Sequence, residues 1–127
     1  MTPEFLAAVI DTLLPGDDVL SSGSAAGVRL DDHAVLRTIA ARSGGEATFV
    51  AASEPARIAV LEAIERTEPA AFRALVTATL ADYCDSPAVL TALGWSAAPP
   101  QPTGHRLLST DESRTSAAQR RPPLWRA

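Results

Sequence analysis

The stretch TEPAAFRALVTATLADYCDSPAVLTALGW, residues 67–95, decides the fold. Its apolar residues recur at intervals of three and four, which places them on one face of an α-helix. That face comprises Phe72, Leu75, Val76, Thr79, Leu80 and Tyr83. The sequence DSP at 85–87 then predicts the start of a short helix that Gly94 ends. The apolar residues of this short helix are Val89, Leu90 and Leu93.

Two similar tripeptides predict where the central helices begin. SEP at 53–55 and TEP at 67–69 each offer a Ser or Thr cap, a Glu in the first turn and a Pro within that turn. We therefore expect one helix to start at each tripeptide. In the first of these helices the spacing turns Ile58, Leu61 and Ile64 inward. It turns Glu62, Glu65 and Arg66 outward.

The N-terminal part predicts two further helices joined by a loop. Thr2 can cap a helix that begins at Pro3 and stops at LPG, residues 14–16. The apolar stripe of this helix is Leu6, Val9, Ile10 and Leu13. Residues 15–27, PGDDVLSSGSAAG, have the composition of a connecting loop. Val28, Val35, Leu36 and Ile39 predict a second helix over 28–42, ended by the glycines at 44 and 45.

Together these patterns predict an all-α protein, a small bundle of about five helices with an extended Pro-rich C-terminal tail. No window alternates apolar and polar residues as a strand would. The helical body covers 1–95, and the composition changes after Trp95. Residues 1–95 carry six Arg and thirteen acidic residues, a net charge of −7. Residues 96–127 carry five Arg and two acidic residues, a net charge of +3.

The bulk numbers exclude several classes of protein. The net charge of the 127 residues is −4. Proteins that bind nucleic acids usually carry clustered positive charge, so this value disfavours a nucleic acid as the partner. A single cysteine, Cys84, allows neither an intramolecular disulfide nor a multi-thiolate metal site. No apolar run approaches the roughly 20 residues of a membrane span. The N-terminus shows no signal peptide or twin-arginine signal, so we expect a cytoplasmic location.

The residue types that could carry chemistry do not form a recognisable site. They are His33, His105, Cys84 and the pairs Asp17-Asp18 and Asp31-Asp32. The two histidines have no partner at metal-ligand spacing, so we expect no metal site. Cys84 directly follows the apolar stripe, so we expect a half-buried helix residue. The acids Asp82 and Asp85 that flank it disfavour a reactive thiolate. The aspartate pairs are expected to be solvated caps, and no catalytic residue is predicted.

Four segments resemble the gluconate 2-dehydrogenase subunit 3 family over nearly the whole chain. They are LAAVIDTLLPGD at 6–17, AAGV at 25–28, residues 67–95 and PPQPTG at 99–104, and the ending RRPPLWRA also looks like that of short members. The most specific piece is the pattern around Tyr83, Asp85, Pro87, Val89, Leu93 and Gly94. Members commonly carry Tyr-Tyr where this chain has Tyr83 and Cys84.

The resemblance implies a small, non-catalytic subunit in a heteromeric oxidoreductase complex. Its partner would be a large flavoprotein of the glucose-methanol-choline oxidoreductase family, which would hold FAD and oxidise an alcohol or sugar hydroxyl. This subunit would stabilise or mature the flavoprotein and would itself bind no cofactor. A haem-bearing third subunit occurs in some complexes of the family, but this chain has no CxxCH motif for covalent haem.

We expect the partner-binding residues to gather in and before the tail. They are Tyr83, Trp95, Pro99, Pro100, Pro102, Leu124, Trp125 and Arg126. A Pro-rich segment loses little entropy on docking, and Trp and Arg are common interface anchors. The hypothesis is that residues 96–127 wrap over the flavoprotein. A disordered tail is one alternative, and a free-standing helical adaptor without a flavoprotein partner is the other.

Overall fold

A computed structural model describes residues 1–30 and 34–95, together with Gly104, Ser116 and Arg120. The chain divides into two units, Met1–Ala97 and Ala98–Ala127. In the second unit, the amide of Arg120 donates a hydrogen bond of 3.3 Å to the carbonyl oxygen of Ser116. The rest of the tail predicted over 96–127 lies outside the described residues, apart from Gly104. The account of the fold below therefore concerns the first unit.

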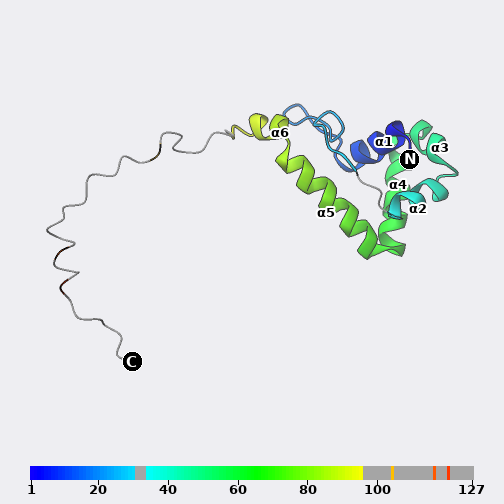
Figure 1. Ribbon diagram of the computed structural model, residues 1–127. Helices are drawn as coiled ribbons and strands as arrows, with labels where there is room; N and C mark the ends of the chain where they lie inside the picture. Colours follow the sequence, from blue (N-terminus) through cyan, green and yellow to red (C-terminus); the bar gives the residue numbers. More distant parts are fainter. Residues whose placement is uncertain (31–33, 96–103, 105–115, 117–119, 121–127) are drawn as a thin grey trace, which may run out of the picture. The chain divides into compact units, whose positions relative to one another are not determined.

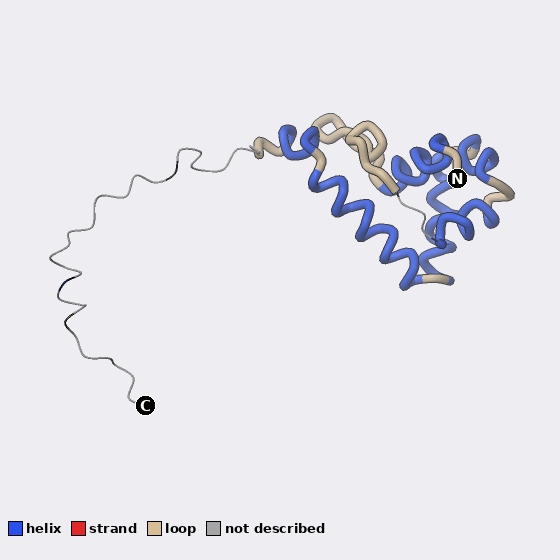
Figure 2. The backbone as a smooth tube through the Cα atoms, in the orientation of Figure 1, coloured by secondary structure: helices blue, strands red, loops and turns tan. Residues whose placement is uncertain are grey.

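The described residues of this unit form six helices and no strand (Figures 1 and 2). The helices are α1 (Pro3–Leu13), α2 (Ala34–Arg42), α3 (Glu46–Ala51), α4 (Glu54–Thr67), α5 (Pro69–Asp85) and α6 (Pro87–Ala92). Helix α1 packs against α3 and α4, and α5 packs against α2, α4 and α6. The predicted all-α fold is confirmed. No described helix is long and apolar enough to cross a membrane.

Local signals explain most of the helix boundaries. The Thr2 hydroxyl accepts a hydrogen bond of 3.3 Å from the amide of Phe5, so the predicted cap of α1 is confirmed. After α6, the amide of Gly94 donates to the Thr91 oxygen and that of Trp95 donates to the Leu90 oxygen. Gly94 has a φ of +73°, and this pair of bonds is a Schellman motif. The predicted end of α6 at Gly94 is therefore confirmed.

The predicted cap at Thr67 is wrong. Thr67 is the last residue of α4, and its hydroxyl donates 2.9 Å back to the carbonyl oxygen of Ala63. Glu68 occupies the N-cap position of α5, ahead of Pro69. The two helices thus follow each other with only Glu68 between them, and no side chain caps the first turn of α5.

Two further predictions about the helices need correction. The second predicted helix does not begin at Val28, because residues 28–30 are not helical and α2 starts at Ala34. Helix α3 was not predicted. It has six residues, and no side chain caps its first turn at Gly45. It is held instead by packing, since Phe49 is fully buried edge-on against Phe5, with 5.5 Å between the ring centres.

The buried side chains form two clusters. The larger cluster joins residues of α1 to α5: Phe5, Ala8, Val9, Val35, Leu36, Ile39, Phe49, Leu61, Ile64 and Leu75. The smaller cluster lies where α1, the loop after it, α5 and α6 meet. Its members are Ile10, Val28, Tyr83 and Val89. Helices α1 and α5 contribute to both clusters, so they connect the two parts of the core.

Three predicted core positions are exposed. Leu61 and Ile64 are buried as predicted, whereas Ile58 is 40% exposed. On α5, Leu75, Thr79 and Tyr83 form the buried ridge, and Leu80 is 48% exposed. Leu93, predicted as part of the apolar stripe of α6, is 57% exposed. Helical spacing identifies an apolar face, but in each case only the centre of that face has a neighbouring helix to cover it.

Candidate docking surface

The loop between α1 and α2 begins with a tight, hydrogen-bonded turn. One oxygen of the Asp17 carboxylate accepts hydrogen bonds of 2.7 Å from the amides of Val19 and Leu20. These two bonds lower the pKa of Asp17. Gly16, with a φ of +77°, lies so close to the backbone of Leu20 and Ser22 that a Cβ atom would clash there. The turn leaves Asp18 and Val19 exposed at its tip.

The middle of the loop is fastened to α1. Both oxygens of the Asp11 carboxylate accept from Ser24, one from its amide at 2.8 Å and one from its hydroxyl at 2.7 Å. The buried Gly23 packs directly against the Cγ2 atom of Ile10, which leaves no room for a side chain. The loop is therefore held on the surface of α1 by a polar pair and a close backbone contact.

The last turn of α5, together with Ser86 between α5 and α6, holds the same loop. The hydroxyl of Tyr83 donates 2.7 Å to the carbonyl oxygen of Ser21, and that of Ser86 donates 2.7 Å to the carbonyl oxygen of Ala26. The amide of Arg29 donates 2.7 Å to Asp82. Figure 1 shows the loop beside α6 and the C-terminal half of α5. These bonds span 53 to 62 residues of sequence, so they fix the tertiary arrangement of this end of the body.

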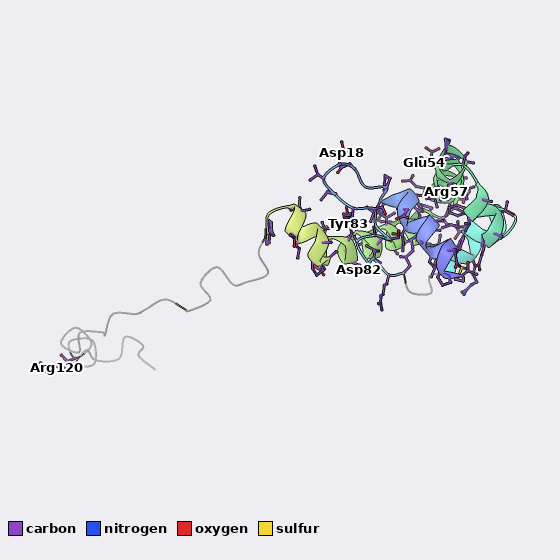
Figure 3. All side chains as sticks on the ribbon, turned by 90° about the horizontal axis from the view of Figure 1, so that it is seen from above. Asp18, Glu54, Arg57, Asp82, Tyr83 and Arg120 are labelled. Carbon is purple, nitrogen blue, oxygen red and sulfur yellow. The ribbon has the colours of Figure 1, made fainter. Side chains whose placement is uncertain are left out.

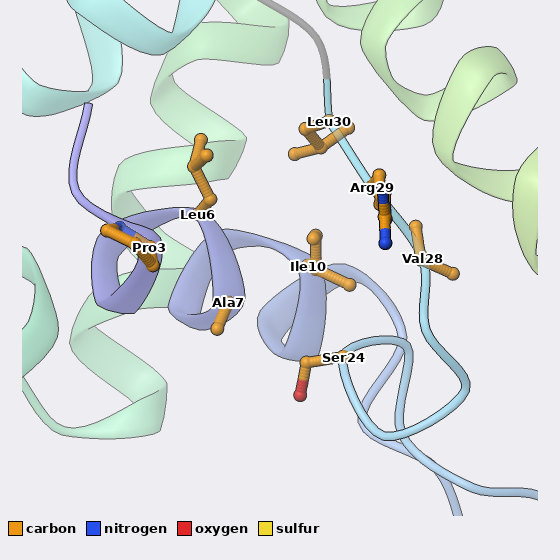
Figure 4. A pocket seen from close by; sticks show the side chains of 8 residues that line it. All are labelled: Pro3, Leu6, Ala7, Ile10, Ser24, Val28, Arg29 and Leu30. Atoms are coloured by element: carbon orange, nitrogen blue, oxygen red, sulfur yellow. The ribbon is translucent and has the colours of Figure 1, made fainter.

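A pocket of about 390 Å³ opens between α1 and the end of this loop (Figure 4). Its lining consists of Pro3, Leu6, Ala7, Ile10, Ser24, Val28, Arg29 and Leu30. Arg29 is the one ionisable side chain in that lining, and the hydroxyl of Ser24 is bonded to Asp11. The pocket therefore has an apolar wall and one cation, without a nucleophile and base placed together.

Among the described residues, the most exposed large apolar side chains lie on the loop, on α5 and directly after α6. Trp95 is 72% exposed and Val19 is 67% exposed, ahead of Leu93 and Leu80. A shallow hollow beside Leu80 is lined by Leu13, Leu14, Val76 and Thr79. Exposed apolar side chains in one region are typical of protein interaction sites. Leu93 and Trp95 are neighbours directly after α6, so this end of the body is the candidate docking surface.

The structure locates two of the predicted partner-binding residues. Trp95 is exposed, directly after α6. Tyr83 is only 8% exposed, and its hydroxyl is bonded within the chain. We therefore assign Tyr83 to holding the loop, whereas the side chain of Trp95 is exposed to solvent. The other predicted residues, Pro99, Pro100, Pro102, Leu124, Trp125 and Arg126, lie outside the described residues.

The residues considered for chemistry remain apart where they are described. Among residues 1–30 and 34–95, together with 104, 116 and 120, no group of three His, Cys, Asp or Glu side chains could hold a metal ion. Cys84 is exposed, so the expected half-burial is wrong. Its position on α5 turns it away from the ridge of Leu75, Thr79 and Tyr83. His33, His105 and the pair Asp31-Asp32 lie outside the described residues.

Sequence reasoning missed the residues that shape the surface. Asp11, Asp82 and Ser86 each bind a backbone or side-chain group of the loop, as does the hydroxyl of Tyr83. One feature of the sequence could have indicated two of these contacts: Asp11 and Asp82 are acidic residues in the last turn of a helix. Negative charge is disfavoured there by the helix dipole, so a partner close by could have been expected.

Searches for similar proteins found no matching family model, curated protein or solved structure.

Proposed function

We propose that this chain is a non-catalytic small subunit that stabilises or matures a FAD-dependent dehydrogenase of the glucose-methanol-choline oxidoreductase family. The complex would oxidise a sugar or alcohol hydroxyl. The proposal assigns FAD and catalysis to the large partner chain and a cytoplasmic location to the complex. It rests on the resemblance of the sequence to gluconate 2-dehydrogenase subunit 3 proteins.

One structural observation supports the proposal. Three of the four segments that carry the resemblance, 6–17, 25–28 and 67–95, come together around one loop. Asp11 binds Ser24, and Ser86 of the third segment binds the carbonyl oxygen of Ala26 in the second. Segments that pack together and leave Trp95 exposed beside them fit a subunit whose role is to bind another protein.

The test is co-expression of the full chain with a candidate flavoprotein from the same host. We expect the two to co-purify, with the yellow absorption of bound flavin in the shared fraction and a higher yield of the flavoprotein. Deletion of 105–127 should weaken co-purification strongly and leave the helical circular dichroism of the body intact. Complex stability unchanged by that deletion would contradict the proposed role of the tail.

Point variants refine this test. Trp125→Ala with Arg126→Ala should weaken the complex, because Trp and Arg anchors contribute most to the binding energy of interfaces. Arg114→Ala is the matched control, since it removes a tail arginine that is not among the predicted anchors. The second candidate function is a free-standing helical adaptor. A well-behaved monomer that gives no flavoprotein any gain in stability would favour that adaptor.

A further inference from the structure

Helix α5 carries a line of apolar side chains beside its buried ridge. Phe72, Val76 and Leu80 follow one another at intervals of four residues, so they lie on one side of the helix. Phe72 and Val76 are half-buried, and Leu80 is 48% exposed. Between Arg73 and Asp82 the exposed residues of α5 carry no charge. Charge is depleted in the same way at the centres of protein interfaces.

Two hollows lie along this line of apolar side chains. The larger has a volume of about 180 Å³ and is lined by Glu65, Pro69, Phe72, Arg73 and Val76. The smaller has a volume of about 50 Å³ and is lined by Leu13, Leu14, Val76, Thr79 and Leu80. Because Val76 lines both hollows, the two linings form one continuous surface. We call this surface the α5 face.

The larger hollow is bordered by two opposite charges. Glu65 of α4 and Arg73 of α5 are both exposed. Among the residues that the structure describes, neither side chain makes a hydrogen bond or an ion pair. On the same stretch of α4, by contrast, Glu62 and Arg66 pair within the chain at 3.9 Å. The α5 face therefore presents one anion and one cation beside an apolar floor.

This arrangement of charges is complementary to itself. In a two-fold symmetric dimer both copies use the same patch, so that residue i of one copy contacts residue j of the other and the reverse. A two-fold axis that passes over the larger hollow brings Glu65 of each copy to Arg73 of the other. It also places the two apolar floors against each other. A surface with charge of one sign would satisfy only one of these groups, whereas a second copy supplies a partner for both.

We propose that the α5 face joins two copies of this chain in a symmetric dimer. Phe72, Val76 and Leu80 supply the apolar contact, and two reciprocal pairs of Glu65 with Arg73 set its register. The inference goes beyond the proposed function and does not depend on it. The residues directly after α6 that form the candidate docking surface line neither hollow.

The first experiment measures the mass of the full chain in solution. Helix α5 has 17 residues and is about 25 Å long, so a contact along it is small for a permanent dimer. Sedimentation velocity from about 1 µM to about 500 µM should therefore show the mass rising from that of a monomer to that of a dimer. A wild-type chain that stays monomeric over this range would overturn the proposal.

Exchange of the two charges tests the register. Glu65→Arg alone places cations opposite each other in a dimer, and Arg73→Glu alone places anions opposite each other. Each variant should raise the dissociation constant of the dimer by about tenfold or more. An equimolar mixture of the two variants should dimerise again, because every Arg then meets a Glu of the other copy. Contacts within one chain cannot produce this recovery.

The double variant guards against a trivial result of the exchange. Glu65→Arg combined with Arg73→Glu should dimerise as the wild-type chain does, and circular dichroism checks that every variant is folded. If the single variants are folded and their mixture stays monomeric, the pairing is wrong. If the single variants do not fold, a double variant that folds and stays monomeric overturns the pairing in the same way.

Matched charge controls come from the loop between α1 and α2. Asp18→Arg and Arg29→Glu reverse exposed charges that line neither hollow. Figure 3 shows Asp18 on this loop, apart from Glu54 and Arg57 of α4. Neither control should change the dissociation constant of the dimer. An equal loss of dimer in the controls and in the single variants would show that net charge, not the α5 face, governs association.

An apolar pair of variants completes the test. Leu80→Ser should weaken the dimer by about tenfold, and Leu93→Ser should not, although Leu93 is 57% exposed. A dimer that Leu80→Ser leaves unchanged would place the contact on another face. If the wild-type chain is monomeric alone and Leu80→Ser releases a co-purifying flavoprotein, the flavoprotein covers the α5 face. That result would overturn the dimer and support the proposed function, so the two can fail separately.

Discussion

At the scale of single residues, Gly23 shows how closely the loop approaches α1. A Cβ atom at this position would clash with the Cγ2 atom of Ile10. We expect Gly23→Ala to lower the free energy of unfolding by about 1–3 kcal/mol, as overpacking does in other cores. Urea denaturation monitored by circular dichroism measures this change.

A double-mutant cycle separates the clash from other effects of the alanine. In an Ile10→Ala background, the atom that Gly23→Ala would strike is gone. Gly23→Ala should then lower the free energy of unfolding much less than it does in the wild-type chain. An equal loss of unfolding free energy in both backgrounds would show that the close contact with Ile10 does not cause the destabilisation.

Two carboxylates link the stability of the protein to pH. The amides of Leu20 and Val19 lower the pKa of Asp17, and the amide of Thr2, which donates 2.7 Å to Glu46, lowers the pKa of that residue. A pKa depressed in the folded state stabilises the protein above the pKa of the unfolded chain, and this stabilisation is lost as pH falls through the folded value. Stability should therefore fall as pH drops below about 4.

Amide variants test the assignment of this pH dependence. Asp17→Asn and Glu46→Gln keep an oxygen acceptor but cannot change charge in this range. Each variant should show a smaller loss of stability between pH 5 and pH 3, as measured by urea denaturation at the two values. Asp18→Asn is the control, because Asp18 lies beside Asp17 and makes no hydrogen bond or ion pair within the described residues. Identical pH profiles for all three variants would contradict the assignment.

At the scale of elements, the hydroxyl of Tyr83 connects α5 to the loop. Tyr83→Phe removes the hydrogen bond to the Ser21 oxygen and leaves the ring in the smaller core cluster. The free energy of unfolding should fall by about 1 kcal/mol, the usual net value of one hydrogen bond. Cys84→Ser is the control and should be nearly silent, because its side chain is exposed. A silent Tyr83→Phe variant would indicate that water replaces this bond.

The sequence allowed the helices with strong local signals to be predicted. Pro3, Pro55, Pro69 and Pro87 each stand in the first turn of a helix, and Gly94 ends the last one. Helix α3 could not be recognised in the same way, because its six residues have no capping side chain and its stability depends on Phe49 packing on Phe5. Short elements of this kind are determined by tertiary contacts rather than by propensity.

The candidate surface was only partly predictable for a related reason. Trp95 could be named from the sequence, because Trp is a common interface anchor and the polar segment that begins there cannot form a core of its own. The contacts from Tyr83 and Ser86 to the loop join residues 60 or more positions apart, and local patterns carry no information about such pairs. The exposure of Leu80 and Leu93 also depends on which faces have neighbours in the folded chain.

At the scale of the whole molecule, the two core clusters differ in size. The larger cluster has ten buried members and the smaller one has four. Regions with fewer buried contacts open at lower free energy. Amide hydrogen exchange should therefore be faster in α6 and in the loop over 15–28 than in α4. Equal protection in these regions would show that the body unfolds only as one unit.

The hydrogen bonds that fasten the loop also affect where the chain can be engineered. Loops usually accept inserted sequences, but that tolerance depends on backbone that is exposed and unbonded. Between Leu14 and Val28 the backbone is bonded to Asp11 of α1, to Tyr83 of α5 and to Ser86, which joins α5 to α6, so an insertion would disturb contacts between these elements. An epitope or fluorophore tag inserted in this loop should therefore destabilise the body, although the loop is its longest connection.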